Sequence, residues 1–288
     1  MADKKGTSCG HSQGCGQGNP GTAAQDGDEK ITQVLNNIKH KLIVMSGKGG
    51  VGKSSVSAGL AVALAAKGYQ VGLLDVDIHG PSLAGMMGLK GPLDLTADQK
   101  VIPKPVNANL KVVSMQSLMQ NQDQAVIWRG PAKSGVIRQF VGDVQWGNID
   151  FLIIDAPPGT GDEPLSVAQI IPEAKAVIVT TPQDVALADV RKSINFCRTI
   201  QLNILGLVEN MGPFPCPCCG KTISLFKSDG GHKTADKMEV SFLGSLPFDP
   251  NVVKKMDEGR PLELQASATP FVEALEAVAD KALSGLKA

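Results

Sequence analysis

The architecture follows from one segment, Ser46-Gly47-Lys48-Gly49-Gly50-Val51-Gly52-Lys53-Ser54-Ser55. The apolar residues 42–45 precede it and predict a buried strand, and the Ala-rich residues 56–67, ended by Gly68, predict a helix. The order is therefore strand, glycine-rich loop, helix. In that order Gly47 to Ser54 fits the pattern G-x-x-x-x-G-K-S of a phosphate-binding loop at every fixed position. A glycine-rich hairpin without a ligand is the alternative, and the flanking strand and helix argue against it.

The residue types in this loop suit a nucleotide. Glycines let backbone N–H groups converge on phosphate oxygens, and the following helix presents its positive end to the same anion. Lys53 can reach the terminal phosphates, and the Ser54 hydroxyl can bind Mg²⁺. The residues expected to bind the nucleotide are Gly47, Lys48, Gly49, Gly50, Val51, Gly52, Lys53, Ser54 and Ser55.

A second lysine, Lys48, lies early in the loop, where an ordinary phosphate-binding loop does not need one. A solvated surface lysine is the simplest interpretation. The sequence Lys-Gly-Gly-Val-Gly-Lys-Ser, however, resembles the deviant Walker A loop of the MinD, ParA and nitrogenase iron-protein class of ATPases. The resemblance implies that Lys48 reaches into the nucleotide site of a partner subunit, that Lys48 and Lys53 both serve catalysis, and that two copies form an ATP-sandwich homodimer.

Length and composition allow one large α/β domain or two small ones. Net charge is zero and the pI is near 6.9, so no global field recruits nucleic acid or anionic lipid, and neither partner is expected. The sequence contains no apolar run of membrane-spanning length and no apolar signal core, which predicts a cytoplasmic protein. In that compartment the six cysteines indicate metal or redox roles before structural disulfides.

The first 28 residues are polar and Gly-rich, which predicts a flexible arm, and residues 29–288 are expected to form the ATPase domain. The arm carries Cys9 and Cys15, which are too few for a closed metal site. Hydrophobic spacing predicts strands at residues 42–45, 70–74, 110–115, 151–154, 176–180, 204–208 and 240–246. It predicts helices at residues 29–37, 56–67, 136–141, 186–199 and 270–286, and one beginning near Pro164. This pattern indicates an α/β fold with a mostly parallel sheet and helices on both faces.

Carboxylates follow two of these strands. Carboxyl ends of parallel strands form the ligand edge of an open α/β sheet. We therefore expect Asp77 to orient or deprotonate the attacking water, Asp75 to hold Mg²⁺ through water, and Asp155 to bind Mg²⁺ as a Walker B carboxylate. Turn-forming aspartate is the alternative for the Asp-x-Asp pair. Gly159, in a Pro-Pro-Gly turn, is a candidate amide sensor of the γ-phosphate.

Two later strand ends are candidates for the nucleotide base. Asn210 offers a paired donor and acceptor suited to adenine. The loop containing Pro247 and Asp249 follows another predicted strand and can flank the base.

A cysteine cluster, Phe214-Pro215-Cys216-Pro217-Cys218-Cys219-Gly220, lies farther along the chain. Cys216 and Cys219 form a C-x-x-C pair with Cys218 between them. Because a zinc ion or an iron–sulfur cluster generally needs four protein ligands, two subunits related by a two-fold axis can supply them jointly. A redox-active pair, or half a zinc site completed by His232 or the arm cysteines, remains the alternative.

Several motifs together resemble the Mrp family of iron–sulfur cluster carrier ATPases over residues 31 to 280. Beside the phosphate-binding loop they are Asp-Val-Asp-Ile-His-Gly-Pro-Ser, Trp-Arg-Gly-Pro, Ile-Ile-Asp-Ala-Pro-Pro-Gly-Thr-Gly-Asp-Glu, Val-Glu-Asn-Met and Cys-Pro-x-Cys-Gly. The resemblance implies a [4Fe-4S] cluster bridged by Cys216 and Cys219 of two subunits and passed to apo iron–sulfur proteins. Cys218 is a departure from the family pattern and an additional candidate ligand. Some relatives have a fuller N-terminal cluster site, of which this arm has Cys9 and Cys15.

The sequence thus predicts an MgATP-hydrolysing homodimer that carries a labile cluster. Three other classes share some of these features. A positioning ATPase would need a basic or amphipathic targeting surface, a nitrogenase-reductase-like electron donor would cycle its cluster's redox state, and a regulatory ATPase would bind zinc.

Overall fold

The computed structural model describes residues 29–77, 80–118 and 130–287. The predicted arm, with Cys9 and Cys15, lies outside the described residues, as does the Trp-Arg dipeptide before α4. The strands of the main sheet are β1 (Ile38–Ser46), β2 (Val71–Asp75), β5 (Lys104–Pro105), β6 (Leu110–Ser114), β7 (Ile149–Asp155), β8 (Lys175–Thr180), β9 (Asn203–Gly212) and β12 (Phe242–Pro247). Their order in space is β12-β9-β8-β1-β7-β2-β6-β5, and in this described sheet β5 alone runs antiparallel to its neighbour. The mostly parallel sheet is therefore confirmed.

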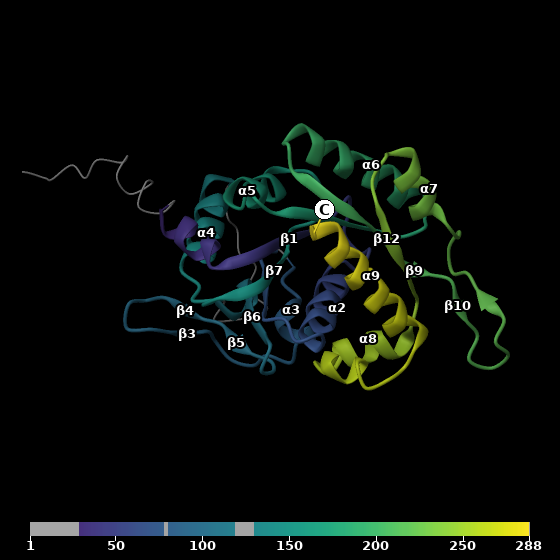
Figure 1. Cartoon of the computed structure of the whole chain (residues 1–288), viewed down its shortest axis with the longest axis horizontal. Helices are drawn as coiled ribbons and strands as arrows, with labels where there is room; N and C mark the ends of the chain where they lie inside the picture. Colours follow the sequence, from purple (N-terminus) through teal and green to yellow (C-terminus); the bar gives the residue numbers. More distant parts are fainter. Residues whose placement is uncertain (1–28, 78–79, 119–129, 288) are drawn as a thin grey trace, which may run out of the picture.

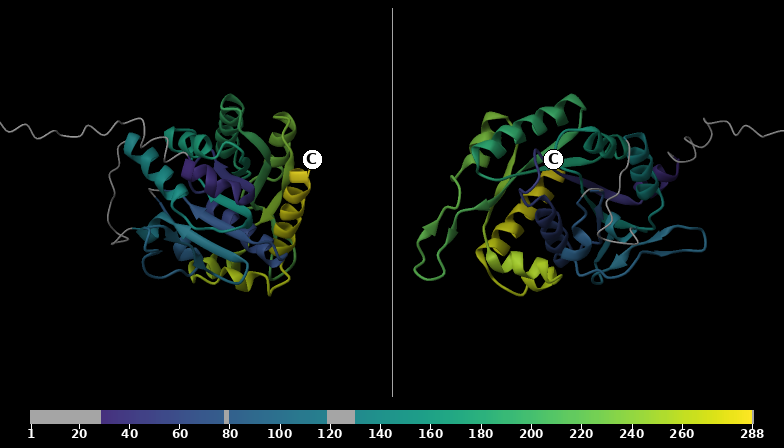
Figure 2. Two further views of the ribbon diagram at one scale, coloured as in Figure 1. Left: turned by 60° about the vertical axis from the view of Figure 1, so that its left-hand side comes forward. Right: turned by 180° about the vertical axis from the view of Figure 1, so that it is seen from behind.

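Helices cover both faces of the sheet (Figures 1 and 2). One face packs against α2 (Lys53–Ala66), α3 (Leu83–Met86), α8 (Pro250–Asp257), the 3-10 helix η2 (Pro261–Leu264) and α9 (Pro270–Lys287). The other packs against the helix at residues 29–36, α4 (Gly130–Gly142), α5 (Asp162–Ile170), α6 (Asp184–Thr199) and α7 (Gly230–Lys237). None of the helices in the described part of the chain is both long and apolar enough to span a bilayer.

The central strand β1 explains the apolar run before the glycine-rich loop. Leu42 and Val44 belong to one core, Ile43 and Met45 to the other, and all four are completely buried. A strand buried on both faces must be continuously apolar, which is the pattern of residues 42–45. Burying each such side chain contributes about 1.5–3 kcal/mol, so this strand is firmly fixed. Its carboxyl end, which begins the loop, is correspondingly well positioned.

One difference from the sequence-based expectation lies in β9. Hydrophobic spacing predicts a strand over residues 204–208, whereas β9 continues to Gly212. The extension is stabilised by β12, whose Pro247 pairs in register with Gly212. Asn210 therefore lies within the strand rather than in the loop after it.

Cys197 is a packing residue, as expected for its position on α6. Its side chain is buried beside Met45, with 3.9 Å between the two sulfur atoms. Burial raises the pKa of the Cys197 thiol to about 11. This cysteine is therefore inert compared with those near residue 216.

Two small hairpins extend from the body. One pairs β3 (Asp94–Leu95) with β4 (Val101–Ile102), ahead of the 3-10 helix η1 (Met115–Leu118). The other pairs β10 (Phe214–Pro215) with β11 (Thr222–Ile223), and we call residues 214–223 the cysteine hairpin. Figures 1 and 2 show the cysteine hairpin reaching away from the sheet, beyond β9 and α7.

Candidate functional site

The phosphate-binding loop joins β1 to α2 at the carboxyl edge of the sheet. Close approaches explain two of its glycines. A Cβ on Gly47 would lie 2.4 Å from the backbone carbonyl carbon of Asp189 in α6. A Cβ on Gly52, whose φ is +78°, would lie 2.2 Å from Asn210 Nδ2 in β9. The loop is thus held between α6 and β9, with no room for side chains at these two positions.

The outer side of the loop is open. Gly49 and Gly50 are exposed, and a Cβ on either would meet nothing within 4 Å. The helix α2 begins at Lys53 with Gly52 as its N-cap, so no capping side chain covers its first N–H groups, and its first turn contains no acidic residue. Such a helix end favours an anion, which matches the predicted phosphate site.

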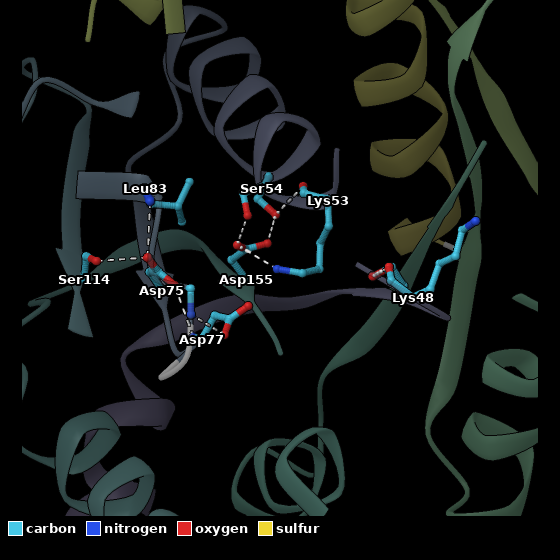
Figure 3. A network of polar contacts seen from close by, with 11 residues as sticks. Lys48, Lys53, Ser54, Asp75, Asp77, Leu83, Ser114 and Asp155 are labelled. Carbon is cyan, nitrogen blue, oxygen red and sulfur yellow. Dashed lines mark hydrogen bonds and ion pairs between the residues drawn. The ribbon is translucent and has the colours of Figure 1, made fainter. Parts of the chain in front are cut away.

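Lys53, Ser54 and Asp155 meet below this loop (Figure 3). Lys53 Nζ lies 2.8 Å from Asp155 Oδ2, with side chains 7% and 0% exposed. The Ser54 hydroxyl donates to Asp155 Oδ2 at 2.6 Å, and the Ser57 hydroxyl donates to Oδ1 at 2.7 Å. The fold therefore brings the start of α2 and the end of β7 together at the carboxyl edge of the sheet.

The geometry of this cluster fits a nucleotide phosphate and a divalent cation. The Lys53 ammonium is close enough to Asp155 for an ion pair, but it makes no well-directed hydrogen bond to any described residue. A phosphate oxygen is an acceptor that would satisfy it. The Ser54 hydroxyl and the Asp155 carboxylate are oxygen ligands of the type that Mg²⁺ prefers.

Asp75 is buried at the end of β2, beside β7. Its Oδ2 accepts hydrogen bonds from Ser114 Oγ at 2.9 Å and Leu83 N at 3.2 Å. Burial and then the nearby charge of Asp155 raise the pKa of Asp75 to about 7, against which the hydrogen bonds act. A positive charge placed beside Asp75, in addition to that of Lys53, would favour the ionised form of the Asp75 carboxyl.

Asp77, the expected catalytic carboxylate, lies just beyond β2 and is largely buried. Its backbone N–H donates to Asp75 Oδ1 at 3.1 Å, and its own Oδ1 accepts from Gly80 N at 3.2 Å. Asp77 thus has the turn geometry of the alternative interpretation, and it also lies beside Asp75 in the site (Figure 3).

Lys48 and Gly159 lie at the rim of the site. The Lys48 side chain is half-buried and points away from Lys53, on the far side of the loop from Asp75 (Figure 3). The Lys48 carbonyl accepts a hydrogen bond from Ser46 Oγ at 2.9 Å. Gly159, with φ +94°, donates its amide to Ser46 O at 2.8 Å. The amide predicted to sense the γ-phosphate is therefore bonded to Ser46, the first residue of the loop.

The residues expected at the base are less tightly grouped. Asn210 Nδ2 donates to Val51 O at 3.0 Å, which links β9 to the phosphate-binding loop. Pro247 ends β12, and Asp249 caps α8 by accepting from Asn251 N at 2.9 Å. Asp249 is thus engaged in helix capping, while Asn210 directly contacts the loop.

The cysteine hairpin presents its sulfur atoms at the surface. Cys216 is half-buried, and Cys218 and Cys219 are exposed. The turn closes through hydrogen bonds from Cys216 N to Lys221 O and from Gly220 N to Cys216 O, both 2.8 Å. Hydrogen bonds from the backbone N–H of Cys218, then from that of Cys219, hold the pKa of the Cys216 thiol below its usual value. The turn therefore favours a thiolate, the form that binds metal.

Three further polar residues support the site and were not singled out from sequence. Ser57 lies one helical turn beyond Lys53, a spacing that could have indicated it. Ser114 faces Asp75 through the β2–β6 register, which no local pattern reveals. Glu209 is buried just before Asn210, and a carboxylate at the end of an apolar strand was a usable signal.

Comparison with known proteins agrees with this arrangement. Residues 37–283 match the family described as "ParA: NUBPL iron-transfer P-loop NTPase". The chain is 48% identical over 258 residues to the "Iron-sulfur cluster carrier protein" of Saccharolobus solfataricus, covering 89% of this chain and 87% of that protein. It is also 48% identical to the "Cytosolic Fe-S cluster assembly factor CFD1" of Kluyveromyces lactis, covering 79% and 83%.

Solved structures show the same fold. An Archaeoglobus fulgidus nucleotide-binding protein in complex with ADP superposes with a TM-score of 0.73 at 40% identity, covering 82% of this chain and 93% of that one. The Pyrococcus furiosus cell division ATPase MinD superposes with a TM-score of 0.63 at 24% identity, covering 85% and 98%, which supports the fold alone.

Proposed function

Because the chain belongs to the ParA family of NUBPL-type iron-transfer P-loop NTPases, we propose that it is an ATP-hydrolysing iron–sulfur cluster carrier. In this proposal two copies hold one [4Fe-4S] cluster between their cysteine hairpins and pass it to apo iron–sulfur proteins. One relative is named an iron–sulfur cluster carrier protein, which supports the carrier role. Another is named a cytosolic Fe-S cluster assembly factor, which also supports a cytoplasmic location.

The nucleotide step uses the cluster of groups below the loop. Lys53 would leave Asp155 to bind the terminal phosphates, and Ser54 and Asp155 would hold Mg²⁺. Asp75 would support the cation through water, and Asp77 would orient the attacking water. Lys48, which points away from its own Lys53, is available to a second subunit. The bound ADP in the Archaeoglobus fulgidus structure supports nucleotide binding in this fold.

The cargo step uses the cysteine hairpin. One hairpin offers Cys216 and Cys219, with Cys218 beside them, whereas a four-iron cluster generally takes four thiolates. Two hairpins meeting across a two-fold axis provide Cys216 and Cys219 twice. The position of the hairpin outside the body leaves its tip accessible to a second copy and to a client protein.

The observation that carries the proposal is the placement of a thiolate-favouring C-x-x-C turn directly after the strand that contacts the phosphate-binding loop. Anaerobic purification with iron and zinc analysis, a visible spectrum and a mass measurement in solution tests it. We expect a brown dimer with about two irons per chain. A strictly monomeric iron-loaded protein would overturn the bridging site, and about one zinc per chain would favour the regulatory alternative.

Transfer is tested separately from loading. Cluster transfer to an apo-ferredoxin is measured with MgATP and without nucleotide, in protein shown to hydrolyse ATP. We expect different transfer rates, because nucleotide binding moves the elements that hold the cysteine hairpin. Equal rates would remove the coupling from the proposal and leave a passive carrier.

A further inference from the structure

A buried carboxylate lies between the nucleotide site and the cysteine hairpin. Glu209 is 1% exposed, and no lysine, arginine or histidine in the described part of the chain forms an ion pair with it. Its Oε2 accepts a hydrogen bond from Gly231 N at 2.6 Å, and its Oε1 accepts from Ser245 Oγ at 2.9 Å. Burying a carboxylate without a cation is costly, so an apolar or amide residue would be the cheaper choice if packing alone mattered.

Both partners of Glu209 lie beyond the cysteine hairpin in the chain, whereas Glu209 itself precedes it. Gly231 lies in the first turn of α7, the helix into which the chain returns from the cysteine hairpin. A Cβ on Gly231 would lie 2.8 Å from Glu209 Cβ, so a glycine is needed for this approach. Ser245 belongs to β12, which pairs with β9 in register at Glu209. Glu209 thus fastens α7, the helix that follows the cysteine hairpin, to β9, the strand that precedes it.

The same strand contacts the nucleotide site one residue later. Asn210 Nδ2 donates to Val51 O at 3.0 Å, and it faces Gly52 at the start of α2. The hairpin's outgoing end is tied down as well, because Phe248 N donates to Gly212 O at 3.0 Å and the Phe214 and Phe248 rings are 5.5 Å apart. A displacement of β9 at the loop therefore acts on both ends of the hairpin.

We propose that Glu209 is a positioning residue that transmits nucleotide-dependent movement of the phosphate-binding loop, through β9 and α7, to the cysteine hairpin. The inference rests on the proposed function, whose cargo site is that hairpin. A carboxylate suits this role because it accepts both hydrogen bonds at once, whereas a glutamine has one accepting oxygen, so that with Gly231 N–H bonded to it the Ser245 hydroxyl would have to turn from donor to acceptor.

The test compares Glu209→Gln with wild type in full-length, metal-free protein, in a Cys9→Ser, Cys15→Ser background. The matched control is Glu173→Gln, the same change at an exposed residue. Its partner, Lys41, lies in the first half of β1, away from the carboxyl end that leads into the phosphate-binding loop. The rate of hairpin thiol modification by an alkylating reagent is measured with MgATP and without nucleotide. Repeating it in Cys216→Ser identifies the Cys216 phase.

We expect MgATP to change the Cys216 rate about fivefold or more in wild type and Glu173→Gln. In Glu209→Gln the change should fall below about twofold, with ATP affinity and iron loading retained. A merely structural role would lower stability without removing the nucleotide response. A full response in Glu209→Gln would overturn this inference and leave the carrier function intact, since iron loading and dimer formation are measured independently. No response in wild type would overturn the inference too.

Should Glu209→Gln fail to fold, hydrogen exchange of the Gly231 amide in wild type provides a second test. MgATP should change its exchange rate, because this amide donates to Glu209. An exchange rate that is the same with and without MgATP would equally overturn the inference.

Discussion

The ion pair between Lys53 and Asp155 predicts that replacing the lysine costs stability as well as nucleotide binding. From sequence alone, Lys53→Ala is expected to abolish ATP-dependent function with little effect on folding. The pair changes that expectation, because both side chains are buried and Nζ lies 2.8 Å from Oδ2. In Lys53→Met, Asp155 keeps the hydroxyls of Ser54 and Ser57 but loses this cation.

The magnitude follows from what remains around the carboxylate. Removing one partner of a buried pair typically costs 3–5 kcal/mol. Because two short hydrogen bonds still reach Asp155, we expect the lower end, about 3 kcal/mol, for Lys53→Met in nucleotide-free protein. Urea denaturation followed by circular dichroism measures this loss, provided that the transition is two-state.

A double variant separates the lost charge pair from the altered packing. Lys53→Met combined with Asp155→Asn removes both charges, and the new amide can exchange hydrogen bonds with the two serine hydroxyls. We expect it to be at least about 2 kcal/mol more stable than the sum of the single effects. A Lys53→Met protein within about 1 kcal/mol of wild type, or strictly additive effects, would refute the reasoning.

Three further predictions concern Asp75, the phosphate-binding loop and the cysteine hairpin. Burial and the charge of Asp155 raise the pKa of Asp75 to about 7 in the folded chain, against 3.8 ordinarily. Because the folded chain then holds a proton that the unfolded chain has lost, the free energy of unfolding of nucleotide-free protein should fall by at most about 4 kcal/mol between pH 4 and pH 8. Urea denaturation across this range should give a shallower decline for Asp75→Asn, and equal declines would contradict the assignment. Gly52→Ala should destabilise by about 1–3 kcal/mol in thermal or urea unfolding, because φ is +78° and the Cβ would lie 2.2 Å from a side-chain nitrogen, whereas Gly49→Ala, with open space around it, should not. Cys216→Ser should lose its iron while retaining ATP binding, and Cys218→Ser should keep about two irons per chain; iron loss in the latter would make Cys218 a required ligand.

The phosphate-binding loop could be predicted because its determinants are local. Gly47 to Ser54 are contiguous, and the strand before them and the helix after them have strong hydrophobic patterns. Strand-end carboxylates such as Asp155 could also be predicted from sequence, since the carboxyl ends of parallel strands lie at one edge of the sheet. These features need no knowledge of long-range pairing.

Other features depend on contacts between distant segments. The ion-pair partner of Lys53 is 102 positions away in sequence, and no propensity or spacing specifies that the two side chains meet. The extension of β9 to Gly212 requires β12 beside it, and polar residues in that stretch would by themselves suggest a loop. Tertiary pairing overrides local propensity in such edge regions of a sheet.

The ion pair between Lys53 and Asp155 bears on how the proposed nucleotide and cation bind. Lys53 and Asp155 neutralise each other in a buried site, and in the proposed function phosphate binds the first and Mg²⁺ the second. If phosphate alone took Lys53, Asp155 would remain a buried carboxylate beside Asp75, whose pKa its charge already raises. If Mg²⁺ alone took Asp155, the Lys53 ammonium would be left without an anion. Because each half-filled state leaves an uncompensated buried charge, the fold favours simultaneous binding of cation and nucleotide over either one alone.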